Sequence, residues 1–332
     1  MRRRDLLALM AGTAASGSMA GHAQQAPRTI PLVGALWLGR PDAPIIVSAR
    51  DAFARGLRAE GYVEGQNILV EDRYVINAEQ LTSVANEIVS LKPDVILAGA
   101  TPGALAAKRA TGVIPIVGNN LADPVGDGLA ASLSRPGGNV TGNTFIGPEL
   151  GPKRLQLMRD LLPGITRVAA LRHPGVYSER TMQAMSTEME TAAAKLGVAL
   201  QVFNAAGPDE FDEAFDAMSK AREDALVLLP SPMFYVNYQR LVDLAAAHRL
   251  PTMYYFKEAV QAAGLMSYGA DIIYQVQLTA GYVAQILRGA NPAELPIQQP
   301  TKFELLINLK TAKELGLTVP ALLLAQADEI IE

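Results

Sequence analysis

The side chains best suited to hold a ligand follow two short apolar runs within residues 93–128. The runs, 95–98 and 114–117, are separated by a helix-compatible segment, which predicts a strand, a helix and a second strand. Thr101 is suited to cap the helix, and Pro102 is suited to its first position. Because the first N–H groups of a helix have no partner within it, this loop can hold a small anionic or polar group.

A second loop, after residue 117, carries Asn119 and Asp123. Parallel strands open their carboxyl ends onto one edge of a sheet, so we expect both loops to meet there. Asn119 would contribute a side-chain amide, and the carboxylate of Asp123 could meet an amine. The alternative for Asp123 is structural, because an aspartate before a proline often only forms a turn. Likewise Thr101 could cap the helix, bind the ligand, or do both.

Motifs for catalysis and for metal binding are missing. The chain has no cysteine, and after residue 23 its only histidines are His173 and His248, far apart in the sequence. We find no HExxH, GxSxG or GxxxxGK[ST] motif, and no GxGxxG after the first expected strand. The sequence therefore favours binding over catalysis, and it indicates neither a metal site nor a cofactor.

Composition indicates a globular protein of about two domains. The chain has 332 residues, of which 49% are hydrophobic and 19% charged. Its net charge is −4; residues 1–23 contribute +2, so the remainder carries −6. Without a basic run, there is no electrostatic reason to expect binding to nucleic acid or to an anionic membrane.

Residues 1–23 have the features of an export signal. Three arginines precede a modest apolar segment, and small residues stand at Gly21 and Ala23, as signal peptidase requires. The arginines resemble those of a twin-arginine signal. We expect cleavage near Ala23 and a periplasmic protein. The alternative is an amphipathic or disordered N-terminus of a cytoplasmic protein. No later apolar segment reaches the ~20 residues needed to span a membrane.

The rest of the chain alternates between strand-like and helix-like segments. Such alternation implies parallel sheets with helices on both faces. A segment rich in Gly, Asn and Pro at 134–147 separates two such series and is the expected connection between them. A tail with a long helix at 272–288, a strand at 302–309 and further helices at 311–315 and 321–330 is too short to form a third domain. The fold class is therefore α/β, with two doubly wound lobes.

The second lobe should present its own loops at the carboxyl ends of its strands. These loops carry His173, Ser231 and the pair Tyr254 and Tyr255. Neighbouring strand residues point to opposite faces, so one tyrosine should be buried and the other should reach a cleft; we select Tyr254. His173 precedes a proline, so a structural role is an equal alternative.

Between facing lobes, Trp37 and a tyrosine could enclose the apolar part of a small molecule. The sole tryptophan could equally belong to the core. Asp271 is a second candidate partner for an amine. Tyr268 could contact the ligand or serve only as part of a hinge.

Several segments resemble a known family, the periplasmic substrate-binding proteins of ABC transporters with the type 1 periplasmic binding fold, which includes tryptophan- and tyrosine-binding members. The similar segments are GLRAEGYVEGQNI (56–68), IPIVGNNLADPVGDGL (114–129), SLSRPGGNVTG (132–142), GLMSYGAD (264–271) and QPTKFELLINLKTAKELGL (299–317). Two positions depart from the family pattern: RHPG follows residue 171 where Trp-Asn-Pro is common, and Ser231 stands where Asp is frequent.

The resemblance implies two lobes joined by three hinge crossovers, near 142–145, 268–269 and 299–302. Lobe 1 would comprise 24–143 plus 269–300, and lobe 2 would comprise 144–268 plus 301–332. Asn143, in the first crossover, joins the expected ligand contacts.

The same resemblance implies a receptor that binds an amino acid or an aromatic or branched carboxylate and delivers it to an ABC permease. The alternatives are a sensory binding protein that docks on a chemoreceptor or kinase and a periplasmic α/β enzyme. We expect a monomer, because a receptor that closes on its solute and docks on a permease must keep its lobe faces free.

Overall fold

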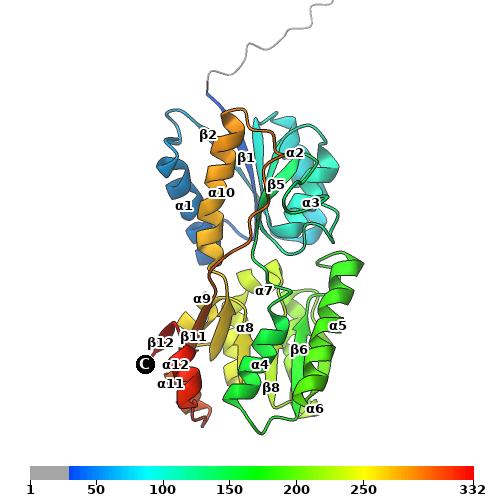
Figure 1. Ribbon diagram of the computed structural model, residues 1–332, viewed down its shortest axis with the longest axis vertical. Coiled ribbons are helices and arrows are strands. Elements are labelled where there is room, and N and C mark those ends of the chain that lie inside the picture. The colour runs from blue at the N-terminus through cyan, green and yellow to red at the C-terminus, as the bar shows by residue number, and fades with distance from the viewer. Residues whose placement is uncertain (1–29) are drawn as a thin grey trace, which may run out of the picture.

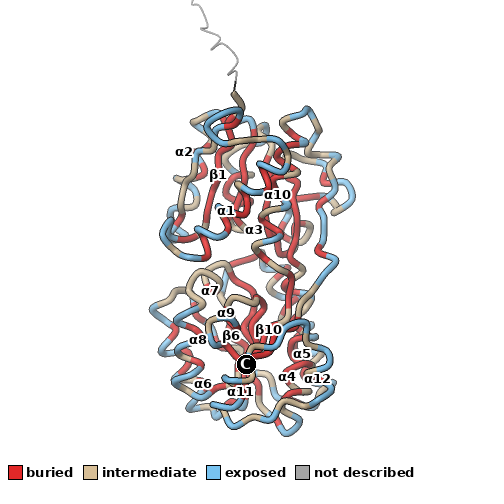
Figure 2. The backbone as a smooth tube through the Cα atoms, turned by 90° about the vertical axis from the view of Figure 1, so that its left-hand side faces the viewer, coloured by how far each residue is buried: buried red, intermediate tan, exposed pale blue. Residues whose placement is uncertain are grey.

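The computed structural model describes residues 30–332, which form two α/β lobes placed one after the other along the long axis of the molecule (Figure 1). The predicted export signal at 1–23 lies outside the described residues. Buried backbone runs through the centre of both lobes (Figure 2), so each lobe has its own core.

The first lobe is built on a five-stranded sheet in which every strand pair is parallel, in the order β2-β1-β3-β4-β5. Its strands are β1 (Leu32–Leu38), β2 (Leu69–Val75), β3 (Val95–Gly99), β4 (Ile116–Leu121) and β5 (Val140–Thr144). Its helices are α1 (Pro44–Ala59), η1 (Ala78–Gln80), α2 (Leu81–Ser90), α3 (Ala100–Ala110) and α10 (Ile272–Leu287).

Alternation along β1 divides the core of this lobe into two layers. Val33, Ala35 and Trp37 pack in the layer that contains residues of α1 and α10, which lie side by side in Figure 1. Leu36 packs on the opposite face with residues of α2 and α3. Because β1 is buried on both faces, it is apolar throughout rather than alternately polar, as is typical of a central parallel strand.

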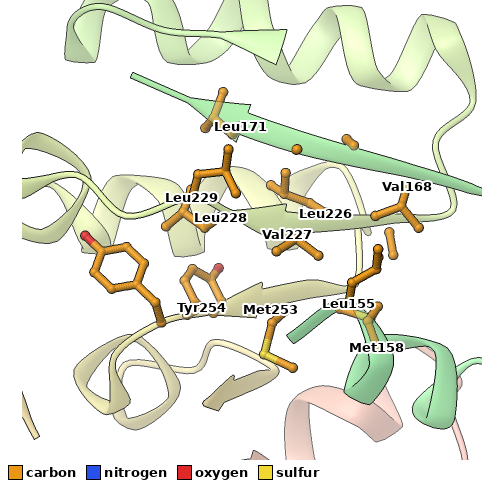
Figure 3. Close-up of a cluster of buried hydrophobic side chains, with 14 of the residues drawn as sticks. Leu155, Met158, Val168, Leu171, Leu226, Val227, Leu228, Leu229, Met253 and Tyr254 are labelled. Carbon is orange, nitrogen blue, oxygen red and sulfur yellow. The ribbon is translucent and has the colours of Figure 1, made fainter. Parts of the chain in front are cut away.

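The second lobe contains a seven-stranded sheet in the order β12-β11-β10-β9-β8-β6-β7. The strands are β6 (Arg167–Arg172), β7 (Ala199–Asn204), β8 (Ala225–Leu228), β9 (Thr252–Tyr254), β10 (Met266–Gly269), β11 (Glu304–Asn308) and β12 (Glu329–Ile331). The helices are α4 (Gly151–Leu161), α5 (Glu179–Leu196), η2 (Pro208–Glu210), α6 (Phe211–Ala221), α7 (Pro232–Val236), α8 (Tyr238–Ala247), α9 (Lys257–Gln261), α11 (Leu309–Glu314) and α12 (Ala321–Gln326). Figure 3 shows side chains from β6, β8, β9 and α4 within one buried cluster.

The predicted α/β fold class is confirmed, with one difference in the second sheet. Strand β11 pairs antiparallel with β10. The cause is the path of the chain, since β10 runs toward the first lobe and β11 enters the second lobe as the chain returns from it. The predicted helix at 321–330 is also wrong at its end, because Glu329–Ile331 forms strand β12 and pairs with β11. The expected connection at 134–147 likewise contains strand β5.

The chain passes between the lobes three times, after β5, after β10 and before β11. The first and third passages lie close together, because Asn143 forms an isolated β-bridge with Gln298. The exact lobe limits stay a prediction.

Gly142 allows β5 to lie against β4. Its φ is +135°, and a Cβ added there would collide with the carbonyl oxygen of Gly118. A side chain at this position would therefore meet both backbone strain and a steric clash with a backbone atom that cannot easily move.

We predict that Gly142→Ala lowers the free energy of unfolding by about 3 kcal/mol, the sum expected from backbone strain and overpacking. Urea denaturation followed by circular dichroism measures the loss. Gly138→Ala is the matched control, because an added Cβ there meets no atom within 4 Å. Equal midpoints for the two variants would contradict the proposed packing role of Gly142.

Candidate ligand-binding cleft

A cavity lies between the lobes and, with its open side included, encloses about 660 Å³ of empty space. The first lobe contributes Trp37, Leu38, Ile45, Ile46, Ala49, Gly99, Ala100, Asn119, Asn120, Ile272, Ile273 and Val276. The second lobe contributes Phe145, Tyr177, Ser231, Pro232, Tyr235, Val236 and Tyr255.

The polar edge of the cavity is formed where β4 ends and α3 begins. The backbone N–H of Ala100 donates a long hydrogen bond to Asn119 Oδ1, at 3.5 Å. Both Ala100 and Asn120 have a φ of +50°. Such a conformation costs energy in an alanine and is tolerated better by an asparagine, and it is frequently retained at ligand sites.

Asn120 is held in place by the neighbouring crossovers. Its N–H donates to Asn143 Oδ1 at 2.8 Å, and its Nδ2 donates to the carbonyl of Ile272 at 3.2 Å. Its Oδ1 has no hydrogen-bond partner among the described residues, although the residue is only 7% exposed. This oxygen is therefore a buried acceptor without a partner, on a residue that lines the cavity.

The second lobe supplies an aromatic wall. Phe145 and Tyr255 have ring centroids 6.2 Å apart, and Tyr235 donates its hydroxyl proton to Glu258 at 3.3 Å. The hydroxyl of Tyr255 donates to the carbonyl of Ser231 at 2.6 Å. Burial raises the pKa of Tyr177, Tyr235 and Tyr255, so all three phenols are neutral at physiological pH.

Ser231 lies at the start of α7, where its Oγ accepts a hydrogen bond from the N–H of Met233 at 3.2 Å. The same Oγ is 2.8 Å from Nδ1 of His173. Burial lowers the pKa of His173 below its ordinary value of 6.5. His173 therefore supports a cavity residue without lining the cavity itself.

Arg154 of α4 lies behind the aromatic wall and is 1% exposed. Its Nε donates to the carbonyl of Tyr268 at 2.8 Å and its Nη1 to that of Gly147 at 2.7 Å. Its guanidinium carbon is 5.7 Å from the ring centroid of Tyr255. Since Gly147 follows β5 and Tyr268 lies near the end of β10, next to two different passages between the lobes, Arg154 ties the hinge to the cavity wall.

A carboxylate from the first lobe contacts the second lobe directly. Asp127, in the loop between β4 and β5, accepts hydrogen bonds from the N–H of Ser178 at 2.9 Å and from Thr181 Oγ1 at 2.8 Å. Ser178 and Thr181 form the first turn of α5. This contact holds the lobes together in the conformation that the structure describes.

Of the predicted site residues, Trp37, Asn119 and Ser231 line the cavity. Trp37 Nε1 donates to Asp72 Oδ1 at 2.7 Å, which positions the indole. Two further predicted residues bond to lining residues, Asn143 to Asn120 and His173 to Ser231. Tyr268 does not line the cavity, and its carbonyl accepts from Arg154 behind the wall.

Thr101 and Pro102 do not begin helix α3, as the sequence led us to expect. The helix begins two residues earlier than expected, at Ala100, with Gly99 as its cap. Thr101 is fully buried, and its Oγ1 accepts a hydrogen bond from the N–H of Ala122 at 3.0 Å. It joins α3 to the loop after β4 instead of lining the cavity, and Pro102 does not line it either.

Both candidate carboxylates for an amine have structural partners. Asp123 accepts from the N–H of Gly126 at 2.7 Å, the turn-forming alternative. Asp271 caps α10 by accepting from the N–H of Tyr274, and it forms an ion pair with Lys257 at 2.5 Å. Neither carboxylate lines the cavity.

The choice of Tyr254 over Tyr255 is not supported. Tyr254 lies in the core of the second lobe, where Figure 3 shows it near Met253, and it does not line the cavity. Tyr255, the next residue along the chain, lines the cavity. The alternation of faces was correctly expected, but only the packing of the sheet decides which face is the inner one.

Sequence reasoning missed several lining residues that come from helix starts and crossovers. Tyr177 precedes α5, Tyr235 lies in the short α7, and Phe145 lies in the first crossover. Ile272, Ile273 and Val276 belong to α10, which follows the second crossover. The sequence gives no specific signal for them, because apolar and aromatic residues at such positions are common in cores as well.

Within residues 30–332, no helix is long and apolar enough to cross a membrane. Nor does this part of the chain bring together three or more His, Asp or Glu side chains that could hold a metal ion.

The model of the family described as ABC transporter substrate binding protein matches residues 42–331. The chain belongs to this family. It is therefore a substrate-binding protein and not an enzyme. The tyrosine-binding protein of Clostridioides difficile is 27% identical over 278 residues, which are 82% of this chain and 78% of that protein.

Two solved structures are similar to the whole described molecule. A conserved domain protein from Vibrio cholerae has a TM-score of 0.83 and 28% identity, with 91% of this chain and 100% of that chain covered. The ABC domain from Streptococcus pneumoniae in complex with L-Trp has a TM-score of 0.82 and 24% identity, with the same coverage of 91% and 100%. Both agree with the two-lobed fold of this substrate-binding protein.

The lowered pKa of His173 predicts a pH dependence of stability. Above about pH 6.5 the imidazole is neutral in the folded and unfolded chains alike. As the pH falls, the unfolded chain takes up the proton more readily, so the free energy of unfolding decreases toward and through the folded-state pKa. We expect His173→Gln to reduce this decrease in the free energy of unfolding. Thermal midpoints recorded between pH 7.5 and 5 measure the difference.

His248→Gln serves as the control, because His248 lies away from the cavity, with its Nδ1 2.8 Å from Ser219 Oγ. A His173 variant with the same pH profile as the parent protein would disprove the contribution of this buried imidazole.

Proposed function

We propose that this substrate-binding protein is a periplasmic receptor that captures a small organic solute between its lobes and delivers it to an ABC permease. The observation that carries the proposal is the cavity between the lobes, which has a polar edge from the first lobe and an aromatic wall from the second. Membership of the ABC transporter substrate binding protein family supports the transport role.

The solute class is an amino acid or an aromatic or branched carboxylate. The apolar and aromatic lining suits a side chain of this kind, and the start of α3 with Asn119 suits a carboxylate. The names of two relatives, a tyrosine-binding protein and a domain in complex with L-Trp, agree with a small aromatic ligand. We propose Trp37, Asn119 and Ser231 as direct contacts of the solute.

We further propose that the lobes close over the solute by movement about the three crossovers. A solute that contacts both lobes binds the closed form more tightly than the open form, and this difference is what drives closure. Periplasmic location follows from the predicted signal at 1–23, and we expect the receptor to act as a monomer.

The first test is a thermal-shift screen of ligand-stripped protein against amino acids, aromatic acids, branched carboxylates and nucleobases. A solute present at one hundred times its Kd should add roughly 2.7 kcal/mol to folding stability. Stabilisation by a member of the first three classes supports the proposal. If no compound in the screen raises the melting temperature, the proposed solute class is wrong.

Trp37 provides an independent readout, because it is the chain's single tryptophan and lines the cavity. We predict that each stabilising solute changes the emission excited at 295 nm, with the same Kd as calorimetry. Trp37→Phe should abolish the signal. A solute that stabilises the protein without changing this emission would place binding away from the cavity.

The contact of Asp127 with α5 predicts an effect on closure. Asp127→Ala removes two hydrogen bonds between the lobes, each worth about 1.5 kcal/mol or more because the acceptor is charged. The open form should become more populated, so the radius of gyration from X-ray scattering should increase and the solute Kd should rise about tenfold.

Asp209→Ala is the matched control, since Asp209 is exposed in the second lobe. If Asp127→Ala leaves both the radius of gyration and the Kd at the control values, the contact does not influence closure.

A further inference from the structure

The cavity lining contains no charged side chain from residues 30–332. Its polar groups are the amides of Asn119 and Asn120, the hydroxyl of Ser231 and the neutral phenols of the aromatic wall. An α-amino acid would bring both a carboxylate and an ammonium into this lining. Neutral groups provide no counter-charge for either end of such a ligand, so the surrounding charges decide which end is favoured.

A positive charge lies behind the aromatic wall at Tyr255. Arg154 lies behind Tyr255 and forms no ion pair with a described carboxylate, and its Nη2 has no hydrogen-bond partner. Burial lowers the pKa of Arg154 to about 9, so the guanidinium remains protonated at neutral pH. On the opposite side of the cavity, the start of α3 adds the partial positive charge of a helix N-terminus.

The neighbouring carboxylates do not line the cavity, and Glu149, which interacts electrostatically with Arg154 and Tyr177, is exposed. Glu258 is separated from the cavity by Tyr235, whose hydroxyl it accepts, and burial raises its pKa, which disfavours its charged form. Asp271 is paired with Lys257, and Asp123 accepts a backbone N–H in its own turn. Asp127 is bound to the first turn of α5.

An ammonium needs three acceptors and a counter-charge when it leaves water. Among the lining side chains, the Oγ of Ser231 already accepts the N–H of Met233, and the neutral Oδ1 of Asn120 is buried. Burial of an ammonium against these groups would cost several kcal/mol without compensation. A carboxylate, by contrast, would meet the positive potential of the start of α3, whose Ala100 N–H makes only a long hydrogen bond to Asn119 Oδ1.

We propose that the cleft is specific for an apolar carboxylate that lacks an α-ammonium, such as an aryl- or branched alkanoate, and discriminates against the corresponding amino acid. The inference rests on the proposed solute-receptor function and narrows its ligand class. It assigns the specificity to this chain's own residues, namely an uncharged lining next to the buried guanidinium of Arg154.

Matched pairs of compounds test the proposal. Isothermal titration calorimetry of ligand-stripped protein compares 3-phenylpropionate with L-phenylalanine, and 3-(4-hydroxyphenyl)propionate with L-tyrosine. Within each pair only the ammonium differs. We expect the acid without the ammonium to bind at least tenfold more tightly. An amino acid that binds equally or more tightly would overturn the inference while leaving the receptor function intact.

If neither compound of either pair binds, the proposal that the cleft binds apolar carboxylates is wrong. The wider thermal-shift screen then separates the two claims. A solute of another class that raises the melting temperature retains the receptor function, whereas no stabilising solute at all removes both.

A substitution tests the missing counter-charge directly. Ser231→Asp places a carboxylate in the lining, and an aspartate can still accept the N–H of Met233 at the start of α7. We expect the preference within each pair to fall at least tenfold or to reverse. The titration is performed at pH 8, above the lowered pKa of His173 in the parent protein.

Ser231→Asn is the matched control, because it has the same shape as aspartate, the same capping ability and no charge. It should keep the preference for the acid without the ammonium. Equal preferences in the Asp and Asn variants, both shown by circular dichroism to be folded, would contradict the role of the absent carboxylate. The comparison within the parent protein remains decisive if the Asp variant does not fold.

Discussion

A single buried side chain, Arg154, connects the hinge of this protein to its cavity. Its guanidinium donates hydrogen bonds to carbonyls next to two separate passages between the lobes and lies over the ring of Tyr255. A buried charge is stable only when such bonds compensate its lost hydration. The position of the cavity wall and the path of two crossovers are therefore set by the same group, so a movement of the hinge also moves the wall that faces the solute.

The cavity itself depends on the opposition of two sheet edges. In the first lobe, the carboxyl ends of β3 and β4 bring a helix start and two asparagines together. In the second lobe, loops after β8 and β9 present Ser231 and the aromatic wall. One lobe thus offers polar groups and the other offers apolar surface. A solute with a polar head and an apolar body satisfies both only when the lobes approach each other, which links recognition to closure.

Much of the architecture could be predicted from sequence, because hydrophobic runs and their spacing depend on local properties. The alternation of strands and helices indicated two doubly wound lobes, and the resemblance to a family indicated the crossovers. The antiparallel pairing of β10 with β11 was not predictable in this way, since it follows from the direction in which the chain returns from the first lobe. The strand at the end of the chain was not predictable from sequence either, because residues 329–331 form β12 by pairing with the distant strand β11.

By itself, the sequence determined the α/β class, the absence of catalytic motifs and the placement of Trp37, Asn119 and Ser231 at strand ends, because these follow from residue type and periodicity. Tertiary structure alone decided that Tyr255 rather than Tyr254 lines the cavity, and that Thr101 is a buried acceptor. It also decided that Asp123 and Asp271 bind protein groups. The physical reason is that a side chain's partner is set by which segments, distant in sequence, pack against it.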